Sequence, residues 1–266
     1  MTQTGWLIRN GLRLAVHGGG DSGPALVFQH GLCGDAAQVT EAMAGLAPQR
    51  WASLECQGNG VSEPGLTPSI AAFADDVAAL IETLPGPVVL GGISMGAAIA
   101  CRLAVMRPDL LRALVLVRPA WVCDAAPANM APNAEVGALM ARMPVGQARA
   151  AFAASLTSQR LAHEAPDNLV SLMRFFDRAP QAETARLLTL ISADGPGITP
   201  AELQALNLPT LVCATSQDAI HPLAHAEAVA GLIPGARLVH LPAKGRDKPR
   251  HLAALAVAMT RFIKDI

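Results

Sequence analysis

The 266-residue sequence contains no tyrosine, and aromatic residues make up only 3% of it. The missing tyrosine excludes any mechanism in which a tyrosine hydroxyl acts as the acid or stabilises an oxyanion. Charged residues are also scarce, at 15%, and 20 basic against 21 acidic side chains leave the chain almost neutral. Nucleic acid and acidic membrane surfaces attract concentrated positive charge, so neither is expected as a partner. The expected partner is a small-molecule substrate.

Long apolar segments are missing as well. The most apolar stretch, residues 87–101, is too short to span a bilayer and is interrupted by Gly91, Gly92 and Gly96. The first residues show no basic start followed by an apolar run. We therefore expect neither a signal peptide nor a membrane span.

Cysteine is present at five scattered positions, an odd number. The spacing matches neither a metal-binding motif nor a disulfide framework. We therefore expect reduced thiols in a cytoplasmic protein and no bound metal.

What the sequence does contain is apolar residues, which make up 52% of it and suit a large buried core. They occur in short runs typical of strands, at residues 6–16, 24–31, 51–60, 87–94, 111–119, 209–218 and 236–243. The first run turns at Asn10-Gly11, the strongest short hairpin signal. The later runs are continuous rather than alternating, which indicates strands buried on both faces.

Helical patterns lie between the strand-like runs, at residues 69–84, 95–106, 221–233 and 251–263. The first is preceded by Thr67 as a cap residue and Pro68 at the first helical position. Strand–helix alternation of this kind predicts an α/β fold with a mostly parallel central sheet and helices on both faces.

The alternation stops between residues 122 and 206, where the pattern changes to short amphipathic helices. The segment closes with a capping-box pattern, Thr199 followed by Glu202. We interpret residues 1–121 and 207–266 as the core, and 122–206 as an inserted helical cap or lid that encloses an apolar pocket. The insertion follows a strand whose carboxyl end should face a ligand crevice. The alternative is a segment that only adds packing.

The motif that carries chemistry is Gly-x-Ser-x-Gly at residues 92–96, with Ser94 at its centre. The pentapeptide alone is a weak signal, but here a strand precedes it and a helix follows. Such a turn places the serine hydroxyl above the sheet, next to a helix N-terminus. A glycine-rich turn with a serine cap is the alternative interpretation, and the context favours a nucleophile.

With this motif the chain resembles the α/β-hydrolase fold superfamily, in its cap-bearing branch of small serine esterases. The segment "HGLCG" at residues 30–34 matches the family's His-Gly-x-x-Gly segment. The resemblance implies an oxyanion hole made by the backbone N–H groups of Leu32 and Met95, and no cofactor. Fixed backbone donors suit this task because they need no reorganisation as negative charge develops. His30 is expected to be structural or to contact substrate, rather than to act as the base.

The resemblance also implies a triad acid and a base. Asp218 follows the late strand "LVCATS" and takes the place of the acid, whose task is to orient an imidazole. The base is less clear, because relatives carry Gly-His soon after the last strand and this chain has Gly245-Arg246. His251 comes next, and the order Ser94, Asp218, His251 suits the fold. His221 is the rival, although its position three residues after Asp218 leaves little room for Asp218 to hold it and still aim it at Ser94.

Further residues are candidates for substrate binding. Arg118 ends a strand and is expected to bind a substrate carboxylate or to form a structural ion pair, with Glu55 or an aspartate as partner. Other candidates near the pocket are Trp121, Met130, Phe175, Phe176 and His221.

The function predicted from these residues is a serine hydrolase that cleaves an ester, thioester or lactone of a largely apolar substrate. Hydrolysis of a carbon–carbon bond next to a ketone is a close variant. A non-hydrolytic lyase or cyclase on the same scaffold stays open, and the displaced histidine favours it. A binding protein without turnover is a third alternative, against which the serine turn argues. The sequence also allows a homodimer.

Overall fold

The computed structural model describes residues 3–266 and is built around one mixed sheet. In this part of the chain the sheet has eight strands in the order β1-β2-β4-β3-β5-β6-β7-β8. The bounds are β1 Gln3–Arg9, β2 Leu12–Gly19, β3 Ser22–Gln29, β4 Gln49–Leu54, β5 Val88–Ile93, β6 Leu111–Val117, β7 Thr210–Thr215 and β8 Arg237–Leu241. From β4 to β8 neighbouring strands run parallel, and β1, β2 and β4 pair antiparallel. The predicted mostly parallel sheet is confirmed.

The antiparallel edge contains the hairpin predicted from Asn10-Gly11. These residues have φ angles of 51° and 80°, in the left-handed region that Asn and Gly adopt more easily than other residues. Arg9 pairs with Leu12 across the turn, so the connection has the predicted two residues.

Apolar cores lie on opposite faces of the sheet. One includes α2 (Ile70–Glu82), α3 (Met95–Met106) and α10 (Leu223–Leu232). The other includes α1 (Ala36–Met43) and α11 (Lys248–Lys264). Strands β5 and β7 are buried nearly throughout because helices cover both sides of them. The short 3-10 helices of the core are Ala44–Leu46 and Pro108–Leu110.

Some helix boundaries differ from the predicted ones. Helix α1 was not predicted, and it is only eight residues long. Helix α2 is capped by Ser69, whose hydroxyl accepts the Ala72 N–H at 3.0 Å, so Thr67 is not its cap. Helix α11 begins at Lys248 rather than at His251, because the Asp247 side chain caps it three residues earlier.

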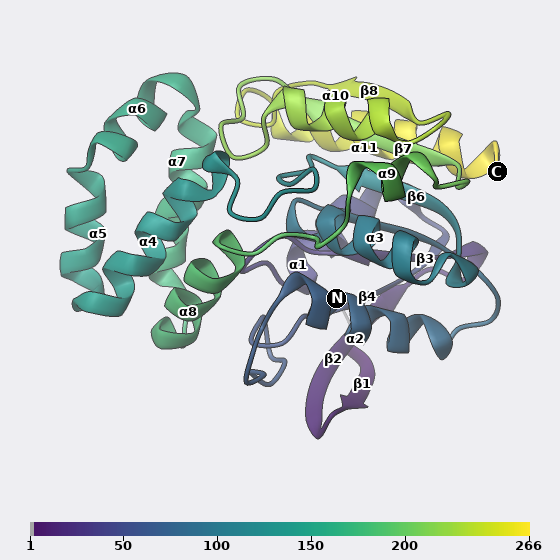
Figure 1. Cartoon of the computed structure of the whole chain (residues 1–266), viewed down its shortest axis with the longest axis horizontal. Helices are drawn as coiled ribbons and strands as arrows, with labels where there is room; N and C mark the ends of the chain where they lie inside the picture. Colours follow the sequence, from purple (N-terminus) through teal and green to yellow (C-terminus); the bar gives the residue numbers. More distant parts are fainter. Residues whose placement is uncertain (1–2) are drawn as a thin grey trace.

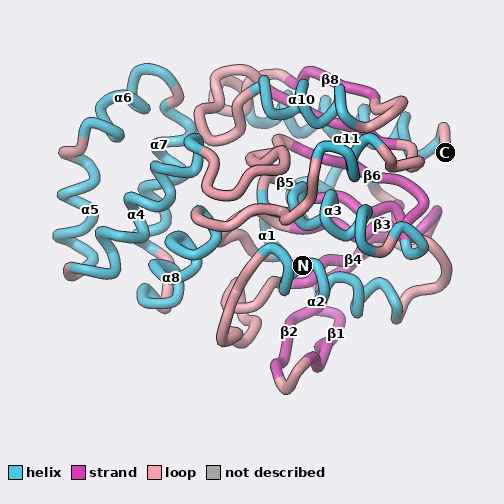
Figure 2. The backbone as a smooth tube through the Cα atoms, viewed as in Figure 1, coloured by secondary structure: helices cyan, strands magenta, loops and turns pink. Residues whose placement is uncertain are grey.

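The segment of residues 122–206 is helical, as predicted, and contains no strand. Its elements are a 3-10 helix at Ala128–Met130, α4 Ala131–Arg142, α5 Val145–Ala153, α6 Leu156–Glu164, α7 Pro166–Met173, a 3-10 helix at Arg174–Asp177, α8 Gln181–Ser192 and α9 Pro200–Gln204. Figure 1 shows α4 to α8 grouped beside the sheet, and Figure 2 shows the loops that join this group to the core. Helix α9, with its predicted capping box, instead packs against α3 and α10.

None of the described helices is long and apolar enough to cross a membrane.

Candidate active site

Ser94 lies in the sharp turn between β5 and α3. Its φ of 59° and ψ of −111° form a conformation that non-glycine residues rarely adopt. Small neighbours make the turn feasible, since a Cβ on Gly92 would collide with the backbone of Gly96, and a Cβ on Gly96 with the carbonyl of Gln29. The Ser94 N–H donates to the Val117 carbonyl at 3.0 Å, which ties the turn to β6. The motif therefore forms the strained strand-to-helix turn that raises a serine above a sheet.

Unpaired backbone donors lie next to this serine. The N–H groups of Leu32 and Met95 have no hydrogen-bond partner among residues 3–266. Leu32 belongs to the loop after β3, which is held by a bond from the Gly31 N–H to the Gln38 side chain at 2.7 Å. A Cβ on Gly31 would lie 3.4 Å from the Cβ of Ser94, so the loop passes beside the serine. Met95 opens α3, where free N–H groups and the helix dipole favour negative charge.

His30 has a structural position. Its ring is fully buried, with Nδ1 donating to the Gly31 carbonyl at 2.8 Å and Nε2 accepting the Cys56 N–H at 3.0 Å. Burial lowers the pKa of His30, which keeps the ring neutral. Both nitrogens are used and the ring does not line the cavity described below, so substrate contact by His30 was wrongly predicted.

Ser94 lies in the wall of a cavity of about 420 Å³. The core contributes the loop after β3, the ends of β5 and β6, the loop after β7 and the start of α11. The helical segment contributes side chains that include Asn133, Asn168, Leu172 and Phe175. Residues 122–206 therefore form part of the wall that faces Ser94. The lining includes the predicted apolar side chains, and several Arg and Lys side chains interrupt them.

His251 lines this cavity and is held by a backbone carbonyl. The residue is 3% exposed, and Nδ1 lies 2.9 Å from the carbonyl oxygen of Pro242. A carbonyl can only accept, so Nδ1 carries the proton and Nε2 keeps a free lone pair. Burial lowers the pKa of His251, and the positive charges of Arg118 and Lys244 lower it further. The geometry therefore provides a neutral imidazole with one basic nitrogen.

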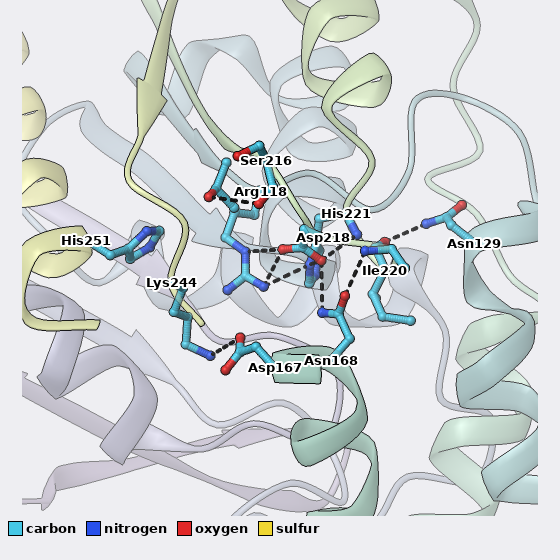
Figure 3. A network of polar contacts seen from close by, with 12 residues as sticks. Arg118, Asn129, Asp167, Asn168, Ser216, Asp218, Ile220, His221, Lys244 and His251 are labelled. Carbon is cyan, nitrogen blue, oxygen red and sulfur yellow. Dashed lines mark hydrogen bonds and ion pairs between the residues drawn. The ribbon is translucent and has the colours of Figure 1, made fainter. Parts of the chain in front are cut away.

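Asp218 does not hold His251, contrary to the prediction. Its carboxylate forms an ion pair with Arg118 at 2.5 Å and accepts hydrogen bonds from Asn168 at 2.9 Å and from the ring of His221 at 2.8 Å. Figure 3 shows these side chains converging on Asp218, with His251 apart from them. Burial opposes ionisation, but the neighbouring His221 ring, the charge of Arg118 and the hydrogen bonds from His221 and Asn168 hold the pKa of Asp218 well below its usual value. Because these partners occupy the carboxylate, the predicted Asp218–His251 contact is absent.

His221 therefore occupies the position expected for the base beside the acid. Its Nδ1 faces Asp218, and its backbone N–H also donates to that carboxylate at 3.0 Å. With Asp218 ionised, Nδ1 carries the proton and Nε2 stays free. Spacing of three residues was expected to leave little room for Asp218 to hold the ring and still aim it at Ser94. The contact with Asp218 forms because the turn after β7 folds the ring back over the carboxylate. Burial lowers the pKa of His221 too, so the cavity wall contains two neutral imidazoles.

The other predicted substrate residues divide into two groups. Arg118 and Phe175 line the cavity, and Arg118 also forms the predicted ion pair with an aspartate. Trp121, Met130 and Phe176 do not line it. They are at most 3% exposed, because Trp121 Nε1 donates to the Asp194 carbonyl and the other two pack in the apolar core. Buried packing therefore replaces the predicted substrate contact at these positions.

Sequence reasoning missed Asn168 and Lys244. The Asn168 side chain donates to Asp218 and accepts the Ala219 N–H at 2.7 Å, which joins α7 to the loop after β7. Lys244 lines the cavity and pairs with Asp167 at 3.3 Å. An asparagine inside an amphipathic helix gives no signal, whereas the position of Lys244 directly after the last strand did offer one.

A comparison with known protein families identifies the fold. The model of the alpha/beta hydrolase fold family matches residues 24–247, which is most of the chain. The chain therefore belongs to the α/β-hydrolase fold family.

Individual relatives are more distant. The sn-1-specific diacylglycerol lipase ABHD11 of Mus musculus is 33% identical over 124 residues, covering 45% of this chain and 38% of the lipase. Lipase LipV of Mycobacterium tuberculosis is 37% identical over 108 residues, covering 40% of this chain and 41% of the lipase. The matches thus span about two fifths of each relative. The structure of a thermophilic esterase from Thermogutta terrifontis has a TM-score of 0.73 at 24% identity, covering 99% of this chain and 97% of the esterase, a likeness in fold.

Proposed function

We propose that this chain is a serine hydrolase that cleaves an ester, thioester or lactone through an acyl-enzyme. The observation that carries the proposal is the strained turn of Ser94 in the cavity wall, beside the free N–H groups of Leu32 and Met95. A nucleophile, two fixed donors and a neutral imidazole in one cavity are the parts that acyl transfer needs. The lipase and esterase names of the relatives support the same class of reaction.

The proposed mechanism begins with Ser94. Its Oγ attacks the substrate carbonyl while Nε2 of His251 takes the hydroxyl proton, and the carbonyl π electrons move onto oxygen. The N–H groups of Leu32 and Met95 stabilise the resulting oxyanion. The intermediate then expels the alcohol, which takes the proton from His251. Water, activated by the same imidazole, cleaves the acyl-enzyme and restores Ser94.

The group that orients the base differs from the one predicted. In this proposal the Pro242 carbonyl fixes the His251 ring, whereas Asp218 fixes His221 and Arg118 and joins α7 to the core. A carbonyl dipole stabilises an imidazolium less than a carboxylate does, and Arg118 and Lys244 destabilise it further. The low pKa of the base is the consequence. Residues 122–206 act as the cap that closes the cavity.

The test is labelling by a fluorophosphonate probe, followed by mass spectrometry of the modified peptide. The Ser94 oxygen displaces fluoride from phosphorus, so a working hydrolase is labelled at Ser94 within minutes. The Ser94→Ala variant should fold normally, remain unlabelled and lose turnover of short p-nitrophenyl esters. Turnover retained by this variant would remove Ser94 from the mechanism.

A second candidate is a non-hydrolytic lyase or cyclase on the same scaffold. Within residues 3–266 no carboxylate hydrogen-bonds to His251, and this favours the second candidate, because such chemistry needs a proton carrier but no strong base next to the serine. The same probe separates the candidates. Prompt labelling together with ester turnover supports the hydrolase, whereas weak labelling with no turnover of any ester supports the lyase or cyclase.

A further inference from the structure

The cavity wall carries more positive than negative side chains. The cationic lining residues are Arg118, Arg174, Arg178, Lys244 and Lys248, and the acidic ones are Asp35 and Glu41. The whole chain, by contrast, has 20 basic and 21 acidic residues. The excess of positive charge is therefore a local property of the cavity.

Most of these cations already have a partner. The ion pairs are Arg118 with Asp218 at 2.5 Å, Arg178 with Asp35 at 3.8 Å, Lys244 with Asp167 at 3.3 Å and Lys248 with Glu41 at 2.5 Å. Arg174 forms no ion pair or side-chain hydrogen bond with any residue in the described range 3–266. When Asp167 and Asp218 are added to the two acidic lining residues, the five cations still exceed the acidic side chains by one.

Lys244 is the other cation that an anion would stabilise. Its side chain is 25% exposed, and its partner Asp167 is on the helical segment. Burial lowers the pKa of Lys244, and the charge of Arg118 lowers it further. A negative group in the cavity would offset both effects, since opposite charge favours the protonated amine. Lys244 and Arg174 thus present positive charge to the cavity from the core and from the helical segment.

The rest of the wall is suited to a short carbon chain. Leu32, Ile93 and Val117 line it near Ser94, and Leu172 and Phe175 line it from the helical segment. A cavity of about 420 Å³ holds a small to medium ligand. The arrangement combines an apolar lining around the serine with unbalanced positive charge.

On the basis of the hydrolase function proposed above, we propose that the substrate is an ester or lactone carrying a carboxylate on a short carbon chain. Arg174 and Lys244 bind this carboxylate. A guanidinium presents two parallel N–H groups that match the planar carboxylate, and charge-assisted bonds of this kind are stronger than neutral ones. Such a substrate is more polar than the largely apolar one expected from the sequence.

The test compares p-nitrophenyl valerate with mono-p-nitrophenyl glutarate, which have acyl chains of equal length and differ in the terminal carboxylate. We expect kcat/KM to be about tenfold or more higher for the glutarate ester, since one charge-assisted bond contributes on this scale. At a pH well above the pKa of His251, Arg174→Gln and Lys244→Gln should each lower kcat/KM for the glutarate ester much more than for the valerate ester, so that most of this preference is lost. Arg142→Gln is the matched control, because Arg142 is an exposed arginine of the helical segment outside the cavity wall.

Equal kcat/KM for the two esters, or an equal loss on both in Arg174→Gln, would overturn the proposal. Calorimetric titration of glutarate, and of phosphate as a rival anion, into Ser94→Ala separates it from the hydrolase function. If glutarate binding depends on Arg174 but the unmodified enzyme cleaves no ester, the proposed hydrolase function is wrong and the carboxylate site stands. If both esters are cleaved at Ser94 but glutarate does not bind, only the proposed carboxylate site is wrong. Tighter binding of phosphate than of glutarate would also contradict the carboxylate site.

Discussion

His221 and His251 line the same cavity, yet their rings are held by different groups. Asp218 accepts from Nδ1 of His221 at 2.8 Å, whereas the Pro242 carbonyl accepts from Nδ1 of His251 at 2.9 Å. Each arrangement leaves Nε2 free, and each ring has a lowered pKa because it is buried. In the proposed mechanism, the histidine held by a carboxylate and the histidine that serves Ser94 are therefore different residues. Chain order favours His251 as the base, and hydrogen bonding alone would favour His221.

The largest expected effect distinguishes these two histidines directly. We expect His251→Ala to lower kcat for ester hydrolysis on the order of 10³-fold, since loss of a general base has effects of this size. His221→Ala should lower kcat by less than about tenfold, because His221 then serves to hold Arg118 and Asp218. Steady-state kinetics of both variants with one substrate is the measurement. If the His221→Ala variant is inactive while the His251→Ala variant is nearly as active as the unmodified enzyme, His221 is the base.

Asp218→Asn tests what the carboxylate does. Arg118 and Asp218 have side chains only 9% and 4% exposed, so this variant leaves a buried guanidinium without its counterion. We expect the free energy of unfolding to fall by about 3 kcal/mol, while kcat falls by less than about tenfold. Denaturant unfolding and kinetics on the same samples measure the two effects.

Asp177→Asn is the control, since Asp177 is 67% exposed in its pair with Arg149 and should change stability by about 0.5 kcal/mol or less. A drop in kcat on the order of 10⁴ at unchanged stability would instead make Asp218 the triad acid.

The pH dependence of kcat is the smallest expected effect. The base works only when neutral, and the pKa of His251 is lowered by burial and by Arg118 and Lys244. Activity should therefore persist as the pH falls below about 6.5, the ordinary value for histidine, and disappear as the pH falls through the lowered pKa. Lys244→Gln removes one positive neighbour, so the acid limb should move to higher pH. An acid limb at or above the ordinary value would contradict a base in this environment.

Much of the fold could be predicted from local patterns. The continuous apolar runs gave correct positions for the buried strands, and Asn10-Gly11 gave the hairpin. Helix α1 was missed because it is only eight residues long, and two helical turns show too little periodicity to stand out. Helix α9 lies with the core, which no sequence boundary indicated. Such short elements are stabilised by packing rather than by propensity.

The sequence by itself determined the strand order along the chain, the helical segment and the turn of Ser94. These depend on residues close in sequence, since apolar spacing selects strand or helix and glycines at 92 and 96 allow the crowded turn. Only the tertiary structure decided which groups surround Asp218, because Arg118 lies 100 residues and Asn168 50 residues away along the chain. The tertiary structure also decided that the cavity wall is cationic, since its charges come from the core and the helical segment together. Hydrogen bonds and ion pairs require atoms to meet within about 3 Å, and that distance is fixed by how separate elements pack.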